Sequence, residues 1–339
     1  MKFLVSLILL SSLLFSYTNK AHIWKEYKRN FIQKDGRVVD FHNKGITHTE
    51  GIGYGLYFAY KMGDDKTFRK IYKWGKRNIK KNNHGLPGWK WGKGKRNSWG
   101  MMDYNSASDA NLWIVYSLLL MYNQTGYIPY KNDADKMIDA IKANHIVKHN
   151  GLTILLPWEK NIAEEYEWNI NPSYLIFEIF EYLAEYDGDK VWNDLIKSSI
   201  IILKKTRFSS LELNPDWSLY SLDTKKFSLH PKNKNFGYDA IRIPLNIIRS
   251  ELSARDKRAL LKPYKEYIQM MKNHALGVVD LKKGIISLYD MSCAHTAVYM
   301  RIAEFYNYDT TLFRKRLNNR MKKNNEDYYA YSLYLLSIL

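Results

Sequence analysis

The pattern of hydrophobic and polar positions predicts helices along almost the whole chain. Apolar residues recur every three or four positions, and short polar breaks that contain glycine, such as residues 63–65 and 187–189, separate successive segments. Twelve helices are expected, at residues 22–33, 50–62, 67–81, 108–122, 134–147, 172–186, 191–204, 239–250, 255–272, 292–306, 311–322 and 328–339. After the first segment they form five pairs, and a last apolar helix follows.

Each pair sets a more apolar helix beside a more charged one. Helix 172–186 carries Phe177, Phe180 and Leu183, whereas its partner carries Lys197 and Lys204. This alternation predicts buried and half-exposed helices in two concentric rings, an all-α architecture. The intervening loops, 83–107, 148–170, 206–238 and 273–291, hold six of the ten tryptophans, and loops of this length are usually functional. Because no linker or repeat interrupts the pattern, residues 22–339 are expected to form one domain.

Three carboxylates stand at the starts of the more apolar helices. Glu50 lies in HTEGIGYGLYFAY, Asp109 in NSASDANLWIVYSLLL and Asp239 in FGYDAIRIPLNII. If these helix starts meet at one end of the double ring, the three side chains converge on one face. Two carboxylates with opposite protonation states are what the hydrolysis of a glycosidic bond requires.

Each of these acids also has a structural explanation. Asp109 could simply complement the dipole of a helix whose N-cap is supplied by the polar residues 105–108. Asp239 could form an ion pair with Arg242, one turn further on.

The structural explanation for Glu50 is a capping box with Thr47. The next residues on that helix include Gly51, Gly53 and Gly55, which lower helix stability. Because glycines have no side chain, they allow another group to approach the helix backbone closely. They therefore argue against a helix with a purely structural role.

Composition limits the other classes of function. The chain is 46% hydrophobic and carries a formal net charge of +18, which first suggests nucleic-acid binding. No nucleic-acid motif accompanies the charge, so no nucleic-acid partner is expected; a basic surface could instead face anionic lipid head groups or acidic polysaccharide. The single Cys293 excludes an internal disulfide, and His48 and His295 stand alone, so neither a metal nor a cofactor is expected.

The first residues predict export. Lys2 precedes an apolar stretch at residues 3–15, which is too short to span a membrane as a helix and suits a signal peptide. Residues 1–21 are expected to be removed and the protein to be periplasmic or secreted. The residues before the expected cleavage site do not follow a clean small-x-small pattern, so an uncleaved anchor is the alternative.

Seven segments in order resemble glycoside hydrolase family 8, and within it the endoglucanases of bacterial cellulose-synthesis operons. They are DGRVVDF (35–41), THTEGIGYGLYFA (47–59), LPGWKWG (86–92), DYNSASDANLWIVYSLL (103–119), NPSYLIFEIFEYLA (171–184), NPDWSLY (214–220) and FGYDAIRIPL (236–245). The resemblance implies an (α/α)6 barrel and an inverting, endo-acting hydrolase of β-1,4-glucan.

The resemblance also implies roles for individual residues. Glu50, in T-E-G where the family has S-E-G, matches the general acid, and Asp239 in Y-D-A-x-R-x-P matches the general base. Asp109 matches the sugar-binding aspartate of the S-D-A-D motif. Asn111 replaces the second acidic residue of that motif, so local details near this helix are expected to differ.

Aromatic residues suit the stacking of sugar rings. The expected substrate-binding residues are Trp89, Trp91, Trp99 and Tyr174 as stacking platforms, with Tyr238 and Arg242 orienting Asp239. A monomer that acts on a β-linked polysaccharide is expected, with polysaccharide synthesis or export machinery as a further partner.

Two kinds of alternative stay open. Within the same family, the chain could be a β-1,4-xylanase, a chitosanase or a mixed-linkage glucanase, although a basic protein does not attract the polycation chitosan. Outside the enzymes, it could be a non-hydrolytic glycan-binding component of a polysaccharide export system.

Overall fold

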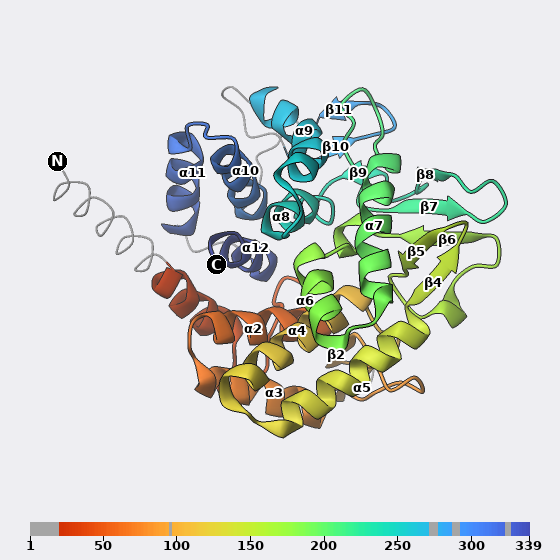
Figure 1. The fold of residues 1–339 in the computed structure, drawn as a ribbon. Coiled ribbons are helices and arrows are strands. Elements are labelled where there is room, and N and C mark those ends of the chain that lie inside the picture. The colour runs from red at the N-terminus through yellow and green to blue at the C-terminus, as the bar shows by residue number, and fades with distance from the viewer. Residues whose placement is uncertain (1–19, 95–96, 271–276, 287–291, 323–326) are drawn as a thin grey trace.

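Six helices form an inner ring that closes on itself in the computed structural model (Figure 1). The structure describes residues 20–94, 97–270, 277–286, 292–322 and 327–339. The inner helices are α2 (Thr49–Lys61), α4 (Ser108–Thr125), α6 (Phe177–Asp187), α8 (Arg242–Arg249), α10 (Cys293–Phe305) and α12 (Tyr328–Ile338). Each contacts the next in order, and α12 contacts α2, so the ring is complete.

A second layer of helices covers the ring. It consists of a helix over residues 20–31 and of α3 (Asp65–Asn78), α5 (Ile128–Asn144), α7 (Lys190–Lys205), α9 (Ala254–Met270) and α11 (Thr311–Lys322). From α3 onward each outer helix packs on the inner helix that precedes it, and the first contacts α2 through Tyr27 and Phe58. The predicted twelve-helix barrel is confirmed.

The number of helix faces that are buried distinguishes the inner helices from the outer ones. Helix α2 buries nearly every position from Gly51 to Ala59, whereas α3 buries Phe68, Ile71 and Trp74, a single stripe at helical spacing. A helix that is apolar all round belongs inside, and one with a single apolar stripe belongs at the surface.

The long connections are not only loops. They contain short strands in small sheets: β1 (Thr47–His48), β2 (Lys90–Lys93) and β3 (Trp99–Asp103); β4 (Ile146–His149) and β5 (Leu152–Leu155); β6 (Glu167–Ile170), β7 (Ser218–Ser221) and β8 (Phe227–Leu229); β9 (Asn235–Phe236), β10 (Val279–Asp280) and β11 (Ile285–Ile286). All pairings are antiparallel. Strands of two to five residues are too short to show an alternating pattern in the sequence.

Several predicted helix starts are wrong. Helix α5 begins at Ile128 rather than at residue 134, because Pro129 fits the first turn of a helix. Residues 172–174 form a single 3₁₀ turn, and α6 begins at Phe177. Helix α8 begins at Arg242, so Asp239 lies in the turn before it and not in its first turn.

The N-cap of α4 also differs from the prediction. The cap is Ala107, which supplies no side-chain hydrogen bond. Ser106 instead bonds the buried ring of His145, with Oγ and Nε2 2.8 Å apart. Its backbone N–H donates to the carboxylate of Glu159 at 3.1 Å. Ser106 therefore binds the C-terminal end of α5 through His145 and the loop after β5 through Glu159.

The glycines of α2 serve helix packing. A Cβ atom on Gly53 would lie 2.7 Å from Cβ of Trp113 in α4, and one on Gly51 would lie 3.1 Å from the hydroxyl of Tyr328 in α12. The expected close approach exists, but the approaching groups belong to neighbouring inner helices. These glycines are therefore no evidence against a structural helix.

A half-buried ion pair joins the inner helices. Arg249, the last residue of α8, contacts Glu178 of α6 at 2.8 Å, and it also donates to the carbonyl oxygen of Leu336 in α12 at 2.8 Å. The hydroxyls of Tyr57 in α2 and Tyr116 in α4 donate to the same carboxylate, at 3.4 and 3.1 Å. Five of the six inner helices therefore meet at one charge pair.

The expected signal peptide, residues 1–21, lies almost wholly outside the described residues. Of the helices in the described ranges, none is both long and apolar enough to cross a membrane.

Candidate active site

A cleft of about 940 Å³ lies across the N-terminal ends of the inner helices. Every inner helix contributes a residue from its first turn or from the segment just before it: Thr49 and Glu50, Ala107 and Asp109, Tyr174, Tyr238 and Asp239, Ser292, and Asp327 to Tyr329. Because the positive ends of the helix dipoles meet here, the cleft favours negative charge. The predicted convergence of the three carboxylates on one face is confirmed.

The cleft continues into a second hollow. The two share Trp89, Ala107 and Tyr174, and the second adds Trp158 and Trp217. These two indoles are stacked, with ring centres 5.5 Å apart and planes at 26°. Together the hollows form one groove with aromatic walls, a surface suited to a chain of sugar rings.

Arg242 connects all three carboxylates. Its Nη1 lies 3.4 Å from Oε1 of Glu50 and 3.4 Å from Oδ2 of Asp109, and its Nη2 lies 2.8 Å from Oδ1 of Asp239. The Arg242 side chain is buried, and Ser173 Oγ accepts a further hydrogen bond from Nη2 at 2.8 Å. The ion pair predicted from sequence between Asp239 and Arg242 is present, but it is one part of a four-residue cluster.

This cluster limits the separation of the two proposed catalytic carboxyls. Because Glu50 and Asp239 contact the two arms of one guanidinium, their nearest oxygens are less than about 9 Å apart. Inverting glycosidases keep their carboxyls roughly 6.5–9.5 Å apart to leave room for a water molecule. The arrangement is compatible with that range.

The other oxygen of Asp239 is held from the opposite side. Trp217 Nε1 donates to Oδ2 at 2.9 Å, and Asn171 Nδ2 donates at 3.3 Å. Asp239 keeps about a third of its side chain exposed to the cleft. Three donors therefore orient a carboxylate that water can still reach.

A fourth carboxylate, Asp216, lies behind the turn that carries Asp239. Its Oδ1 accepts hydrogen bonds from the backbone N–H groups of Gly237, Asp239 and Ala240 at 3.1, 2.9 and 2.8 Å. Burial and the nearby charge of Asp239 raise the pKa of Asp216 to about 7, against the opposing effect of these hydrogen bonds.

Asp109 is almost completely buried. Burial, and then the charge of Glu50, raise the pKa of Asp109 to about 7, while Arg242 acts in the opposite direction. Arg242 supplies one positive charge to three carboxylates, and Asp109 is the member of the cluster that holds its proton up to about neutral pH.

The capping-box explanation for Glu50 is wrong. His48 caps α2, with Nδ1 accepting from the N–H of Gly51 at 3.1 Å, and Thr47 Oγ1 instead bonds Arg37 and the carbonyl of Val38. Within the described part of the chain, Glu50 Oε1 is buried without a hydrogen bond and faces only the ion-pair contact with Arg242. Glu50 is therefore not committed to holding the helix.

The expected stacking residues divide into two groups. Trp89 and Tyr174 line the groove. Trp91 and Trp99 line neither hollow; they stack on each other at 5.2 Å, and Arg37 lies 4.6 Å from both rings. Trp91 is partly buried and packs against the core, so its position needs no role in sugar binding. Trp99 is exposed and lies outside the groove.

Tyr238 and Asn111, which the sequence also singled out, lie in different surroundings. Tyr238 lines the cleft with about half of its surface exposed, and its ring meets His295 edge-on. Asn111 is fully buried behind the cleft, where its Nδ2 lies 3.4 Å from Nε2 of His145. The departure from the family motif therefore lies in the buried interior, and Asn111 does not line the groove.

Sequence analysis missed four residues of this site: Asn171, Asp216, Trp217 and Trp158. The first three lie within the segments NPSYLIFEIFEYLA and NPDWSLY, so the signal was present but no chemistry was assigned to it. Among the described residues, no group of three or more His, Cys, Asp or Glu side chains could hold a metal ion.

Comparison with known proteins identifies the relatives of this chain. The family model described as "Glycosyl hydrolases family 8" matches residues 1–339. An endoglucanase of Escherichia coli O157:H7 is 27% identical over 336 residues, covering 91% of this chain and 90% of the relative. An endoglucanase of Xanthomonas axonopodis pv. citri (strain 306) is 32% identical over 231 residues, 66% of this chain, and that match spans 58% of the relative's length.

A solved structure has the same fold. The endo-beta-1,4-glucanase CMCax from Acetobacter xylinum superposes with a TM-score of 0.81 at 25% identity, over 94% of this chain and 96% of the other. The resemblance inferred from the seven sequence segments is confirmed.

Proposed function

Because the chain belongs to glycosyl hydrolases family 8, we propose that it is an inverting, endo-acting glycoside hydrolase that cleaves β-1,4-glucan chains. The observation that carries the proposal is the position of Glu50, Asp109 and Asp239 around Arg242, on the floor of a groove with aromatic walls. The continuation of this groove past the carboxylates supports binding of a chain on both sides of the cleaved bond.

In the proposed reaction Glu50 protonates the oxygen of the leaving sugar, and Asp239 accepts a proton from a water on the other face of the ring. Trp217, Asn171 and Arg242 fix the orientation of Asp239, and about a third of its side chain stays open to this water. Asp109 binds the sugar at the cleavage point and is itself a buried neighbour of Glu50 whose pKa is raised to about 7.

Reducing-sugar release from carboxymethylcellulose tests the activity. The wild type is expected to release reducing ends and to lower the viscosity of the polymer rapidly, which indicates internal cleavage. Glu50→Gln and Asp239→Asn are expected to lose at least about 10²-fold in kcat, the contribution of a general acid or base. Retained hydrolysis by Glu50→Gln would show that another residue is the acid.

An anomeric NMR time course tests inversion. The first product is expected to carry the α configuration at its new reducing end. Accumulation of the β anomer first would exclude the proposed mechanism.

Substrate choice is the finer part of the proposal. The names of the relatives favour a β-1,4-glucan. Xylan, chitosan and mixed-linkage glucan, assayed beside carboxymethylcellulose, test the alternatives within the family. A non-hydrolytic glycan-binding protein would bind insoluble glucan in a pull-down without releasing sugar from any of these polymers.

Export to the periplasm or medium, and action on a polymer that the same cell secretes, are also proposed from the N-terminal segment and the family. Fractionation of the native cell with an antibody against the chain tests the first part.

A further inference from the structure

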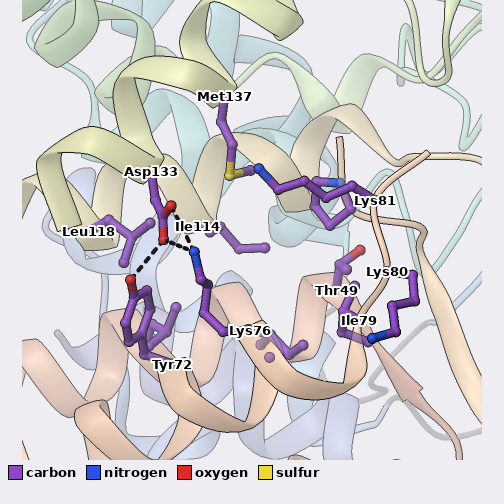
Figure 2. Close-up of a pocket in the computed structure, with 14 residues that line it drawn as sticks. Thr49, Tyr72, Lys76, Ile79, Lys80, Lys81, Ile114, Leu118, Asp133 and Met137 are labelled. Carbon is purple, nitrogen blue, oxygen red and sulfur yellow. Dashed lines mark hydrogen bonds and ion pairs between the residues drawn. The ribbon is translucent and has the colours of Figure 1, made fainter. Parts of the chain in front are cut away.

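A second cavity, of about 310 Å³, lies outside the groove between two helix pairs (Figure 2). Its walls come from α2, α3, α4 and α5, and they are mainly aliphatic: Ile52, Leu56, Ile79, Ile114, Leu118 and Met137. Pockets for small ligands have volumes of roughly 300–1,000 Å³ and walls of this kind. This cavity is at the lower end of that range, which suits one alkyl chain and not two.

The mouth of the cavity is basic. Lys76, Lys80 and Lys81 line it, together with a single acid, Asp133. Asp133 is already neutralised, because Lys76 contacts it at 2.8 Å and the hydroxyl of Tyr72 donates to it at 2.7 Å (Figure 2). The mouth therefore keeps a net positive charge supplied by Lys80 and Lys81.

Lys81 reaches across the apolar part of the mouth. Figure 2 shows its side chain extending toward Met137. The Lys81 side chain is exposed as a whole, yet desolvation lowers its pKa against the weaker opposing effect of Asp133. Within the described ranges no carboxylate forms an ion pair with Lys81, so its ammonium group would gain from an anionic group placed beside it.

The inner end of the cavity holds an unsatisfied hydroxyl. Thr49 is 1% exposed, it lines the cavity, and its Oγ1 has no hydrogen-bond partner among the described residues. Thr49 also lines the active-site cleft and precedes Glu50, so the cavity ends directly behind the proposed acid.

We propose that this cavity binds an amphipathic anion, a single alkyl chain of medium length that carries a carboxylate. The chain lies between Ile52, Leu118 and Met137, and the carboxylate lies beside Lys80 and Lys81. This binding goes beyond glycan hydrolysis and does not depend on it.

Decanoate, below the concentration at which it forms micelles, is the probe. Calorimetric titration of the full chain is expected to give one site per molecule, and decanoate is expected to raise the Tm because it binds the folded state. Decanol and decyltrimethylammonium, which share the chain and lack the negative charge, are expected to bind about two- to fivefold more weakly, the effect of a surface charge pair. Equal binding of all three would overturn the assignment of an anion.

Two variants locate the site. Gly75 lines the cavity, and a Cβ atom there would meet Ile52 at an ordinary 3.8 Å, so Gly75→Leu is expected to fill the space and abolish the titration. Lys81→Glu is expected to weaken decanoate at least about fivefold, whereas Lys73→Glu, the same change on an exposed lysine of α3 outside the cavity, is expected to leave binding intact. If Gly75→Leu fails to fold, the comparison of Lys81→Glu with Lys73→Glu still tests the site. Both of these variants are expected to fold, because they replace exposed side chains. Wild-type affinity in Lys81→Glu would overturn the proposal.

Discussion

The indole nitrogen of Trp217 lies 2.9 Å from Oδ2 of Asp239, so an aromatic side chain of the groove wall also holds the proposed base. The same ring stacks on Trp158 and meets Tyr174 edge-on. Sugar binding and orientation of the base therefore share one residue.

Replacing Trp217 by phenylalanine separates these two tasks. Trp217→Phe keeps an aromatic face but removes the N–H donor, and hydrogen bonds to charged groups contribute about 1.5–3 kcal/mol. We expect kcat to fall roughly 10- to 100-fold with a small change in KM. Trp158→Phe, which changes only the stacking partner, is the matched control and should raise KM while kcat is maintained. Similar kinetics for the two variants would contradict a role for the N–H group.

The protonation of the carboxylate cluster can be tested at Asp109. The raised pKa of Asp109, about 7, reflects burial and the neighbouring Glu50. Asp109→Asn removes the like charge and leaves Arg242 in place, so the remaining acid of the cluster should lose its proton at lower pH than in the wild type. We expect the alkaline limb of the kcat/KM profile to move toward lower pH, in addition to any loss of rate. An unmoved limb would show that Asp109 does not influence the acid.

Asp216 should make stability depend on pH. Its pKa is about 7 in the folded protein, above the ordinary value of about 3.9. The folded state therefore binds this proton more tightly, and stability falls as pH rises from about 4 to about 7. Asp216→Asn keeps an oxygen that can accept from the backbone N–H groups and cannot ionise, so its Tm should fall less over that interval. Parallel Tm curves for variant and wild type would contradict the buried carboxyl.

The ion pair of Arg249 and Glu178 should contribute strongly to stability. Glu178→Gln leaves a half-buried guanidinium without its counter-ion, and we expect a loss above about 1 kcal/mol and below the roughly 3–5 kcal/mol of a fully buried pair. Glu266→Gln, which breaks the exposed pair with Lys262, should change the free energy of unfolding by less than about 1 kcal/mol. Urea denaturation measures the free energy of unfolding of both variants. Equal losses in the two would contradict a role of the Arg249–Glu178 pair in holding the inner helices together.

Two glycine-to-alanine changes compare inner and outer helices. Gly53→Ala places a methyl group 2.7 Å from Trp113, so α2 and α4 must separate, and we expect a destabilisation of about 1–3 kcal/mol. Gly75→Ala in α3 meets its nearest neighbour at 3.8 Å and gains helix propensity, so it should be neutral or stabilising. Equal thermal stability of the two variants would contradict the packing role of Gly53.

The architecture was predictable because burial leaves a periodic signal. A helix that is apolar all round, such as 108–125, differs in sequence from a striped one, such as 65–78, and the alternation of the two predicts the double ring. The convergence of Glu50, Asp109 and Asp239 followed from their position at helix starts. The short strands were not predictable, because two to five residues carry no usable period.

The charge arrangement of the site could be predicted only in part. The contact between Asp239 and Arg242 is local and visible as a spacing. The contacts of Arg242 with Glu50 and Asp109 depend on tertiary structure, and no local pattern reports them. The segment NPDWSLY marks the position of Asp216, but its role was missed because Asp216 acts through backbone N–H groups that carry no sequence identity.

Closure of the inner ring by α12 has a consequence for synthesis of the protein. Helices α2 and α12 are far apart in the chain, yet both contribute to the cleft and they contact each other. Contacts between distant segments form late, because loop-closure entropy opposes them until the intervening elements are in place. A nascent chain that still lacks Tyr328 and Tyr329 has an open ring and an incomplete cleft. The enzyme is therefore expected to be inactive on the ribosome until α12 has emerged and docked.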